Sequence, residues 1–146
     1  MKKILFIILV LAGSTIVFAQ TDAKESVPAE KVHNVVETMP HFPGCEDEEE
    51  RKRSGCAQQR MLQFIYGQLK YPADARYKRT EGTVVVKFVV GSNGEVRDVS
   101  VVKSLRDGCD EEAVRVVKEM PIWIPGILNK KHVAVNYKLP IRFKLQ

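Results

Sequence analysis

Three cysteines are the residues of this chain best suited to covalent chemistry, and their spacing suggests two different roles. Cys45 and Cys56 enclose the charged stretch CEDEEERKRSGC, whereas Cys109 stands alone much later in the chain. In an oxidising compartment we expect Cys45 to pair with Cys56 and to stabilise the fold by about 2–3 kcal/mol, although the sequence leaves the other two pairings open. Cys109 precedes an expected helix, which would lower its thiol pKa if it were exposed. Burial as a small apolar residue is the commoner outcome.

The remaining candidates for catalysis or metal binding are weak. His33, His41 and His132 are scattered, and a site made from His33, His41 and Cys45 would require the N-terminal segment to fold back. The sequence contains no nucleophile elbow, zinc-protease helix motif, phosphate loop or dinucleotide fingerprint. We therefore expect a protein that is not an enzyme and that needs no cofactor or metal. A thiol-based or metal-dependent enzyme using Cys109 is the minor alternative.

The N-terminus has the composition of an export signal. Two lysines precede an apolar run over residues 4–12, and Val17 and Ala19 occupy the small-residue positions of a cleavage site. This pattern predicts a signal peptide over residues 1–19, cut after Ala19. The uncharged residues 4–21 are also just long enough to span a membrane, so an uncleaved anchor is the alternative.

The composition indicates one soluble globular domain of mildly basic charge. The chain has 146 residues, of which 45% are hydrophobic and 28% are charged. Loss of Lys2 and Lys3 with the leader would lower the net charge from +5 to +3. A charge of this size gives no reason to expect binding to nucleic acid.

The segment after the leader predicts a tether. Residues 20–39 are polar, have no clear period and contain Pro28, so we expect a flexible connection with a brief extended piece at 32–36. The folded domain is then expected over residues 40–146. The charge run between the cysteines has acid–base pairs at helical spacing. It predicts a solvated surface loop or helix rather than a calcium loop.

Two helices and a short helical turn are expected. Apolar residues recur at helical spacing from Ala57 until Pro72, which ends the helix and suits the start of a short turn. The second helix covers residues 110–120, with Asp110 or a neighbour as its cap. The two apolar stripes are Met61, Leu62, Ile65 and Leu69 in the first helix, and Ala113, Val116, Val117 and Met120 in the second.

Three strands complete the expected fold. Residues 83–90 alternate, the sequence GSNG predicts a tight hairpin turn, and a second strand follows over about 95–103. A third strand is expected over 133–145. The order of elements predicts an α+β fold, with a small three-stranded antiparallel sheet in the order 2-1-3 and helices packed on one face.

The third strand, in VAVNYKLPIRFKLQ, has the clearest pattern in the chain. Its odd positions from Val133 to Leu145 are apolar, and most of its even positions are polar or charged. A period of two over this length predicts a strand with one buried face. Pro140 donates no N–H to a ladder, and prolines in sheets are confined largely to edges and bulges. The pattern therefore places this strand at an edge of the sheet.

Taken in order, these stretches resemble the C-terminal domain of TonB, in the energy transducer TonB-like form of the Bacteroidetes. The resemblance covers residues 39–145 and rests on a series of short motifs: Tyr71-Pro72, Glu81-Gly82, Asn93-Gly94, Glu112-Ala113, Met120-Pro121, Trp123, Pro125-Gly126 and Leu139-Pro140-Ile141. We expect structural roles for Tyr71, Pro72, Gly82, Gly94, Trp123, Pro125, Gly126 and Pro140. Trp123 in particular should be a core residue covering a helix end. The Cys45–Cys56 insert is absent from the family's ordinary pattern.

The resemblance implies a binding function in energy-coupled transmembrane transport. A periplasmic domain of this kind binds the TonB box of an outer-membrane transporter, which adds as a strand to the edge formed by the last strand. Inner-membrane proton-driven motor proteins are further implied partners, and a homodimer is another option. The alternative is a structural or adaptor domain of the cell envelope that uses the same edge without energy transduction. The expected partner-binding residues are Gln68, Val133, Val135, Asn136, Tyr137, Lys138, Arg142 and Lys144.

Overall fold

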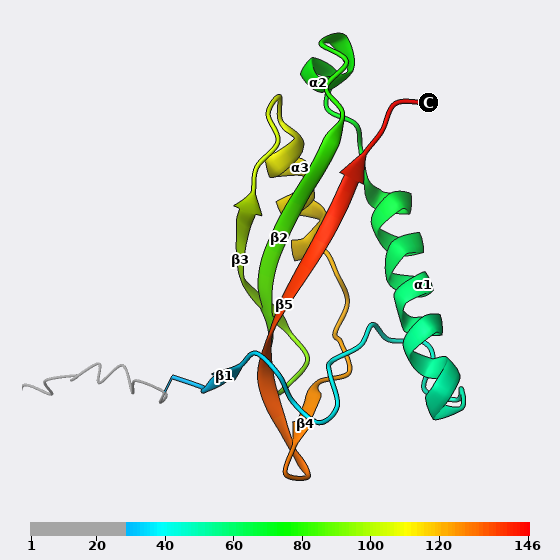
Figure 1. Ribbon diagram of the computed structural model, residues 1–146, viewed down its shortest axis with the longest axis vertical. Helices are drawn as coiled ribbons and strands as arrows, with labels where there is room; N and C mark the ends of the chain where they lie inside the picture. The colour runs from blue at the N-terminus through cyan, green and yellow to red at the C-terminus, as the bar shows by residue number, and fades with distance from the viewer. Residues whose placement is uncertain (1–28) are drawn as a thin grey trace, which may run out of the picture.

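The structure is a computed structural model that describes residues 29–146 (Figure 1). The expected leader and the first part of the expected tether lie outside the described residues. None of the helices within this range has the length and apolar character that crossing a bilayer requires. The elements are β1 (Val32–His33), α1 (Glu50–Gln68), α2 (Ala73–Tyr77), β2 (Gly82–Val90), β3 (Val96–Lys103), α3 (Cys109–Lys118), β4 (Gly126–Leu128) and β5 (Lys131–Phe143).

The predicted α+β fold and its strand order are confirmed. β2 pairs with β3 on one side and with β5 on the other, both antiparallel, so the three long strands have the order β3-β2-β5. Two short strands add to this sheet: β1 falls within the extended piece expected at residues 32–36, although its pairing was not predicted, and β4 was not predicted. β1 runs parallel to β5 on its far side, and β4 forms a hairpin with the first residues of β5. Figure 1 shows β5, in red, lying along the whole length of β2.

The core forms where the helices cover one face of this sheet. Alternate residues of β2 and β5 enter a single cluster with the apolar stripes of α1 and α3, because successive side chains of a strand point to opposite faces. The fully buried members from β2 are Val84, Val86, Phe88 and Val90, and those from β5 include Leu139, Ile141 and Phe143.

Two helix starts differ from the expectation. α1 begins at Glu50, seven residues before Ala57, so the charge run continues directly into the helix. α3 is capped by Gly108, whose φ of 84° lies in the left-handed region, and not by Asp110. The Asp110 carboxylate instead accepts hydrogen bonds from the Leu105 amide, at 2.7 Å, and from the Ser104 hydroxyl. It therefore fixes the turn before the helix.

The described part of the expected tether lies against the sheet. The carboxylate of Glu30 forms an ion pair with Arg97 at 2.9 Å, and Val32–His33 pairs with β5. Backbone bridges then join Thr38 to Ile127 and His41 to Ile124. Residues 29–39 are therefore part of the folded body, which the polar composition of the segment did not predict.

Trp123 is the centre of an aromatic cluster, in agreement with the expected core role. Its side chain is 1% exposed, and its ring lies within 5.0–5.8 Å of the rings of Phe42, Phe88 and Tyr137. Its backbone N–H donates to the Gly94 carbonyl at 2.9 Å. A Cβ atom at Gly94 would lie 2.1 Å from the Trp123 oxygen, so this hairpin turn requires glycine to pack here.

We predict that Trp123→Ala lowers the free energy of unfolding by about 3–5 kcal/mol, because it removes the largest side chain of the core. Ile122→Ala is the matched control, since Ile122 is 57% exposed, and should change stability by less than about 0.5 kcal/mol. Chemical denaturation of both variants measures the difference. Equal stabilities would contradict the central role of Trp123.

The expected disulfide is present. Cys45 and Cys56 are joined with their Cα atoms 6.1 Å apart, and the bond ties the segment before α1 to the second turn of that helix. Cys109 is a buried free thiol. Burial raises its pKa, and Asp107, Asp110 and Glu111 add to the rise. The alternative of a reactive, low-pKa thiol is therefore wrong.

Removal of the disulfide should cost roughly 2–3 kcal/mol of stability, the value for closing a loop of about a dozen residues. The Cys45→Ala/Cys56→Ala double variant, compared with a Cys109→Ala variant under oxidising conditions, tests this in thermal unfolding. Addition of a reducing agent should destabilise the wild type and leave the double variant unchanged. A wild type that is insensitive to reduction would contradict the prediction.

Candidate functional site

The outer edge of β5 is the candidate site, and the direction of its backbone groups decides what it can bind. Nine successive residue pairs join β2 to β5, from Gly82 and Phe143 to Val90 and Val135, without a register shift. The Arg142 amide does not point to β2, because it donates to the Tyr66 hydroxyl on α1 at 3.3 Å. Amide directions alternate along an antiparallel pair. The amides of Asn136 and Lys138 therefore also point outward.

Pro140 fits this edge without loss to the sheet. It lies opposite Val85 of β2, at one of the positions whose backbone groups face outward. The missing N–H of Pro140 therefore removes no bond between β5 and β2. An incoming strand would find the Pro140 carbonyl as an acceptor but no donor from this residue.

The available edge is shorter than the sequence predicted. Val135 lies between His33 of β1 and Val90 of β2, and Val133 lies opposite Gly126 of β4. These two residues, expected as partner contacts, already have strand neighbours. Beyond them, no strand of the described chain pairs with the outer side of β5 from residue 136 to residue 143.

The two faces of β5 differ in charge. Lys138, Arg142 and Lys144 are exposed on the face away from the core, and none of them is in an ion pair within residues 29–146. Tyr137 lies on the helix-covered face, stacked on Phe88 with ring centroids 5.4 Å apart. Asn136 is held by the Asn34 carboxamide, to which it donates at 2.9 Å.

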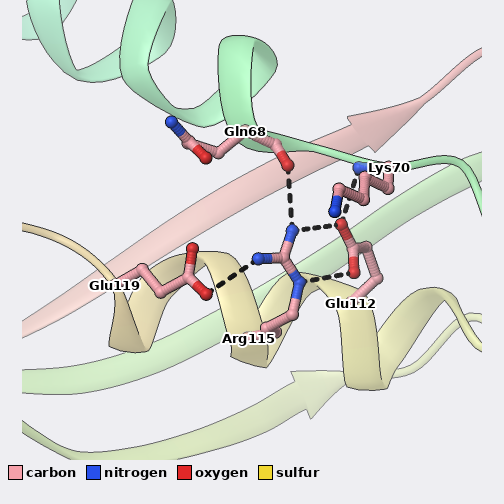
Figure 2. Close-up of polar contacts among 5 residues, drawn as sticks. All are labelled: Gln68, Lys70, Glu112, Arg115 and Glu119. Atoms are coloured by element: carbon pink, nitrogen blue, oxygen red, sulfur yellow. Dashed lines mark hydrogen bonds and ion pairs between the residues drawn. The ribbon is translucent and has the colours of Figure 1, made fainter.

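Gln68 does not lie with the other expected contact residues at the outer edge of β5. It belongs to a polar cluster at the end of α1 (Figure 2). Its backbone carbonyl accepts a hydrogen bond from the Arg115 guanidinium at 2.9 Å, while its exposed side chain points away. Arg115 also contacts the carboxylates of Glu112 at 2.7 Å and Glu119 at 2.9 Å. Glu112 in turn accepts from the Lys70 amide at 2.6 Å. The cluster fastens the end of α1 to α3.

This cluster has only a weak signal in the sequence. Arg115 was not singled out, and the spacing of three and four residues to Glu112 and Glu119 was its only signal. The hydrogen bonds from Arg115 hold the pKa of Glu112 below its usual range and raise the pKa of Arg115. Both residues therefore stay charged over the physiological range of pH.

The structural residues of the expected motifs lie around the ends of β2 and β5. The Tyr71 hydroxyl donates to the Thr80 carbonyl, its ring packs edge-on against Phe143, and Pro72 starts α2. A Cβ atom at Gly82 would lie 2.8 Å from Leu105. These contacts hold in place the start of β2 and the end of β5, where the candidate edge ends.

Comparison with known proteins identifies the domain. A sequence profile described as Gram-negative bacterial TonB protein C-terminal matches residues 67–145, which is more than half of the chain. The chain belongs to the TonB C-terminal family. Domains of this family serve protein interaction in transport rather than catalysis.

Individual relatives are similar over the same part of the chain. Protein TonB of two Helicobacter pylori strains is 32% identical over 78 residues, which is 53% of this chain and 26% of the relative. The chain thus spans about a quarter of the length of these relatives. Two NMR solution structures of Helicobacter pylori TonB-CTD have TM-scores of 0.48 and 0.45, with identities of 23% and 25%. The first covers 71% of this chain and 97% of that chain, and the second covers 60% and 91%.

The match to the TonB family begins at residue 67. The docked N-terminal segment, the disulfide and all but the last two residues of α1 therefore lie before the matched region. Within residues 29–146, no group of three or more His, Cys, Asp or Glu side chains is arranged to hold a metal. Cys45, one member of the alternative ligand set, is oxidised to the disulfide.

We predict that Glu112→Gln reduces the acid sensitivity of the fold. Because the folded-state pKa of Glu112 is lowered, its contribution is complete above the unfolded pKa and is lost as the pH falls through the folded pKa. The variant should lose about 1–2 kcal/mol at pH 7 and show a flatter stability profile below about pH 4.5. Glu111→Gln, an exposed residue of the same turn, is the control for urea unfolding at several pH values. Parallel profiles for all three proteins would contradict the assignment.

Proposed function

We propose that this chain is a periplasmic TonB-like domain that binds the TonB box of an outer-membrane transporter by β-strand addition to β5, in energy-coupled transport. The observation that carries the proposal is the outer side of β5 from residue 136 to residue 143, which has no strand partner in the described chain. An exposed sheet edge is a ready template for an extended peptide. Membership of the TonB C-terminal family supports the choice of partner.

The pattern of backbone groups along this edge favours one short extended segment. Lys138 offers an outward N–H and C=O, whereas Pro140 offers only a carbonyl and the Arg142 amide already donates to Tyr66. The outward Asn136 amide is not free, because the parallel pairing of His33 with Val135 directs it to the His33 carbonyl. An incoming strand would therefore form its regular ladder over residues 138–140. Towards Arg142 it would have to displace the Tyr66 hydroxyl or end.

The charges beside the edge support an acidic partner. Lys138 and Arg142 lie on the same face of β5, Lys144 follows the end of the strand, and all three are exposed. Positive side chains so placed raise the rate of encounter with an acidic segment more than they raise its final affinity. Binding should therefore weaken with increasing salt, mainly through slower association.

The proposal also covers export and coupling. Residues 1–19 as a cleaved signal peptide, or residues 4–21 as an inner-membrane anchor, would place the domain in the periplasm. Contact with proton-driven motor proteins would follow from the anchored form. The alternative function is an envelope adaptor that pairs the same edge with a second copy or another envelope protein. It predicts dimers that persist at low concentration.

The direct test is a titration of the isotope-labelled domain with a synthetic TonB-box peptide from a transporter of the same organism. We expect the largest amide shift at Lys138, with smaller shifts on β3. Lys138→Pro should weaken binding about tenfold, because it removes one outward donor while leaving the ladder to β2 intact.

Lys138→Ala is the matched control and should lose only the contribution of the charge. It should therefore bind within about threefold of the wild type at high salt. Unchanged β5 amides in the titration would end the proposal of strand addition. Equal affinities for the Pro and Ala variants would also count against it.

A further inference from the structure

A cavity of about 490 Å³ lies beside the candidate edge, between the docked N-terminal segment and the first half of α1. Residues 37–42 form one wall, and Arg53, Ser54, Ala57, Gln58 and Met61 of α1 form the other. Trp123 and Tyr137 also line it. The cavity therefore combines an aromatic base with polar groups from α1.

The position of Tyr137 connects this cavity to the edge. Tyr137 is a β5 residue between Asn136 and Lys138, whose amides point outward, and its side chain lies on the helix-covered face. A strand added to β5 would run about 4.8 Å away, and its alternate side chains would point to that same face. One of them would enter the space beside Tyr137.

A second cavity, of about 510 Å³, lies farther along the same edge and is lined by Tyr66, Leu69 and Phe143 among others. Tyr137 and Phe143 are six residues apart, an even number. Strand residues separated by an even number face the same side of a sheet. Only a bound strand that displaced the Tyr66 hydroxyl and continued past Arg142 could therefore direct a side chain to each cavity.

Two unsatisfied donors mark the first cavity. Arg53 Nε and Trp123 Nε1 are the buried side-chain polar atoms without a hydrogen-bond partner in the described residues, and both residues line this cavity. A buried donor without an acceptor is costly. Both atoms have less than 1 Å² of accessible surface, so an occupant could offset this cost only if its binding moved one of these side chains into contact with it.

Charge limits the kind of occupant. Arg53 has no carboxylate within 4.0 Å in the described range, but Glu37 and Glu50 also line the cavity. Both glutamates are exposed and would repel an additional negative charge at the entrance. The combination favours a bulky neutral group over a carboxylate.

We propose that this cavity is a selectivity pocket for one bulky neutral side chain of the strand bound at β5. The proposal rests on the proposed function and adds the rule by which the domain chooses among partners. Most of the walls of the pocket lie before residue 67, outside the region that the family profile matches. The Cys45–Cys56 disulfide, one residue from Ala57, holds the α1 wall in place.

The test is an alanine scan of the TonB-box peptide against the wild type and two tryptophan variants of α1. Gln58 and Gln59 are adjacent and exposed, but only Gln58 lines the cavity. Gln58→Trp should fill the pocket, whereas Gln59→Trp is the matched control. Ser54→Phe, also at an exposed lining residue, is a second filling variant if Gln58→Trp is unstable.

With the wild type, alanine at one bulky peptide position should weaken binding about tenfold or more. Gln58→Trp should weaken the parent peptide by a similar factor and abolish the additional loss at that position, which is the coupling expected of two groups that share one space. Gln59→Trp should retain the wild-type pattern. All variants are first matched for thermal stability.

Two results would overturn the pocket while leaving strand addition intact. One is wild-type affinity of Gln58→Trp for every peptide, with β5 amides still shifting on binding. The other is a uniform loss for all peptides without coupling to any position. A wild type whose β5 amides do not respond would instead refute the proposed function together with the pocket.

Discussion

The antiparallel ladder between β2 and β5 is the constraint on which the rest of the molecule depends. Its unbroken register assigns every β5 residue both a face and a direction for its backbone groups. Side chains at odd positions enter the core, and backbone groups at even positions from 136 onward face outward. A slip of one residue would exchange the two sets. It would place Lys138 in the core and leave Pro140 opposite a β2 carbonyl to which it can donate no hydrogen bond.

The long helices and strands were predictable because each contains several repeats of its hydrophobic period. The alternation of β2 and β5 and the helical stripes predicted the order of the three long strands and the layer arrangement. Pro140 indicated an edge, which holds for the second half of β5 but not for the first half, where β1 and β4 pair with it. Leu62 shows the limit of this reasoning. It lies at helical spacing within the predicted stripe, yet it is 36% exposed, because α1 presents Phe64 to the cluster instead.

The features that the sequence did not reveal depend on contacts between distant residues. Strands of two or three residues, such as β1 and β4, are too short to show a period. The hydrogen bond from Asn136 to Asn34 joins residues 102 positions apart, and the ion pair of Glu30 with Arg97 joins residues 67 apart. Polar side chains in an aperiodic segment are typical of a linker, and only a tertiary partner makes them part of a domain. The cavity beside Tyr137 was hidden for the same reason, since one of its walls is this segment.

The docking of the N-terminal segment would also determine the route of any mechanical load that reaches the domain from its N-terminal side. Tension applied from the N-terminal side would act first on the ion pair of Glu30 with Arg97 and then on β1. β1 lies parallel to β5, next to the proposed partner strand. Parallel neighbouring strands that are pulled at opposite ends slide against each other, so their hydrogen bonds resist in shear and share the strain instead of opening one by one. In this arrangement β1, which limits the length of the binding edge, would also transmit tension. A pull on the N-terminal side of the chain would pass from β1 to β5, and from β5 to the bound partner strand.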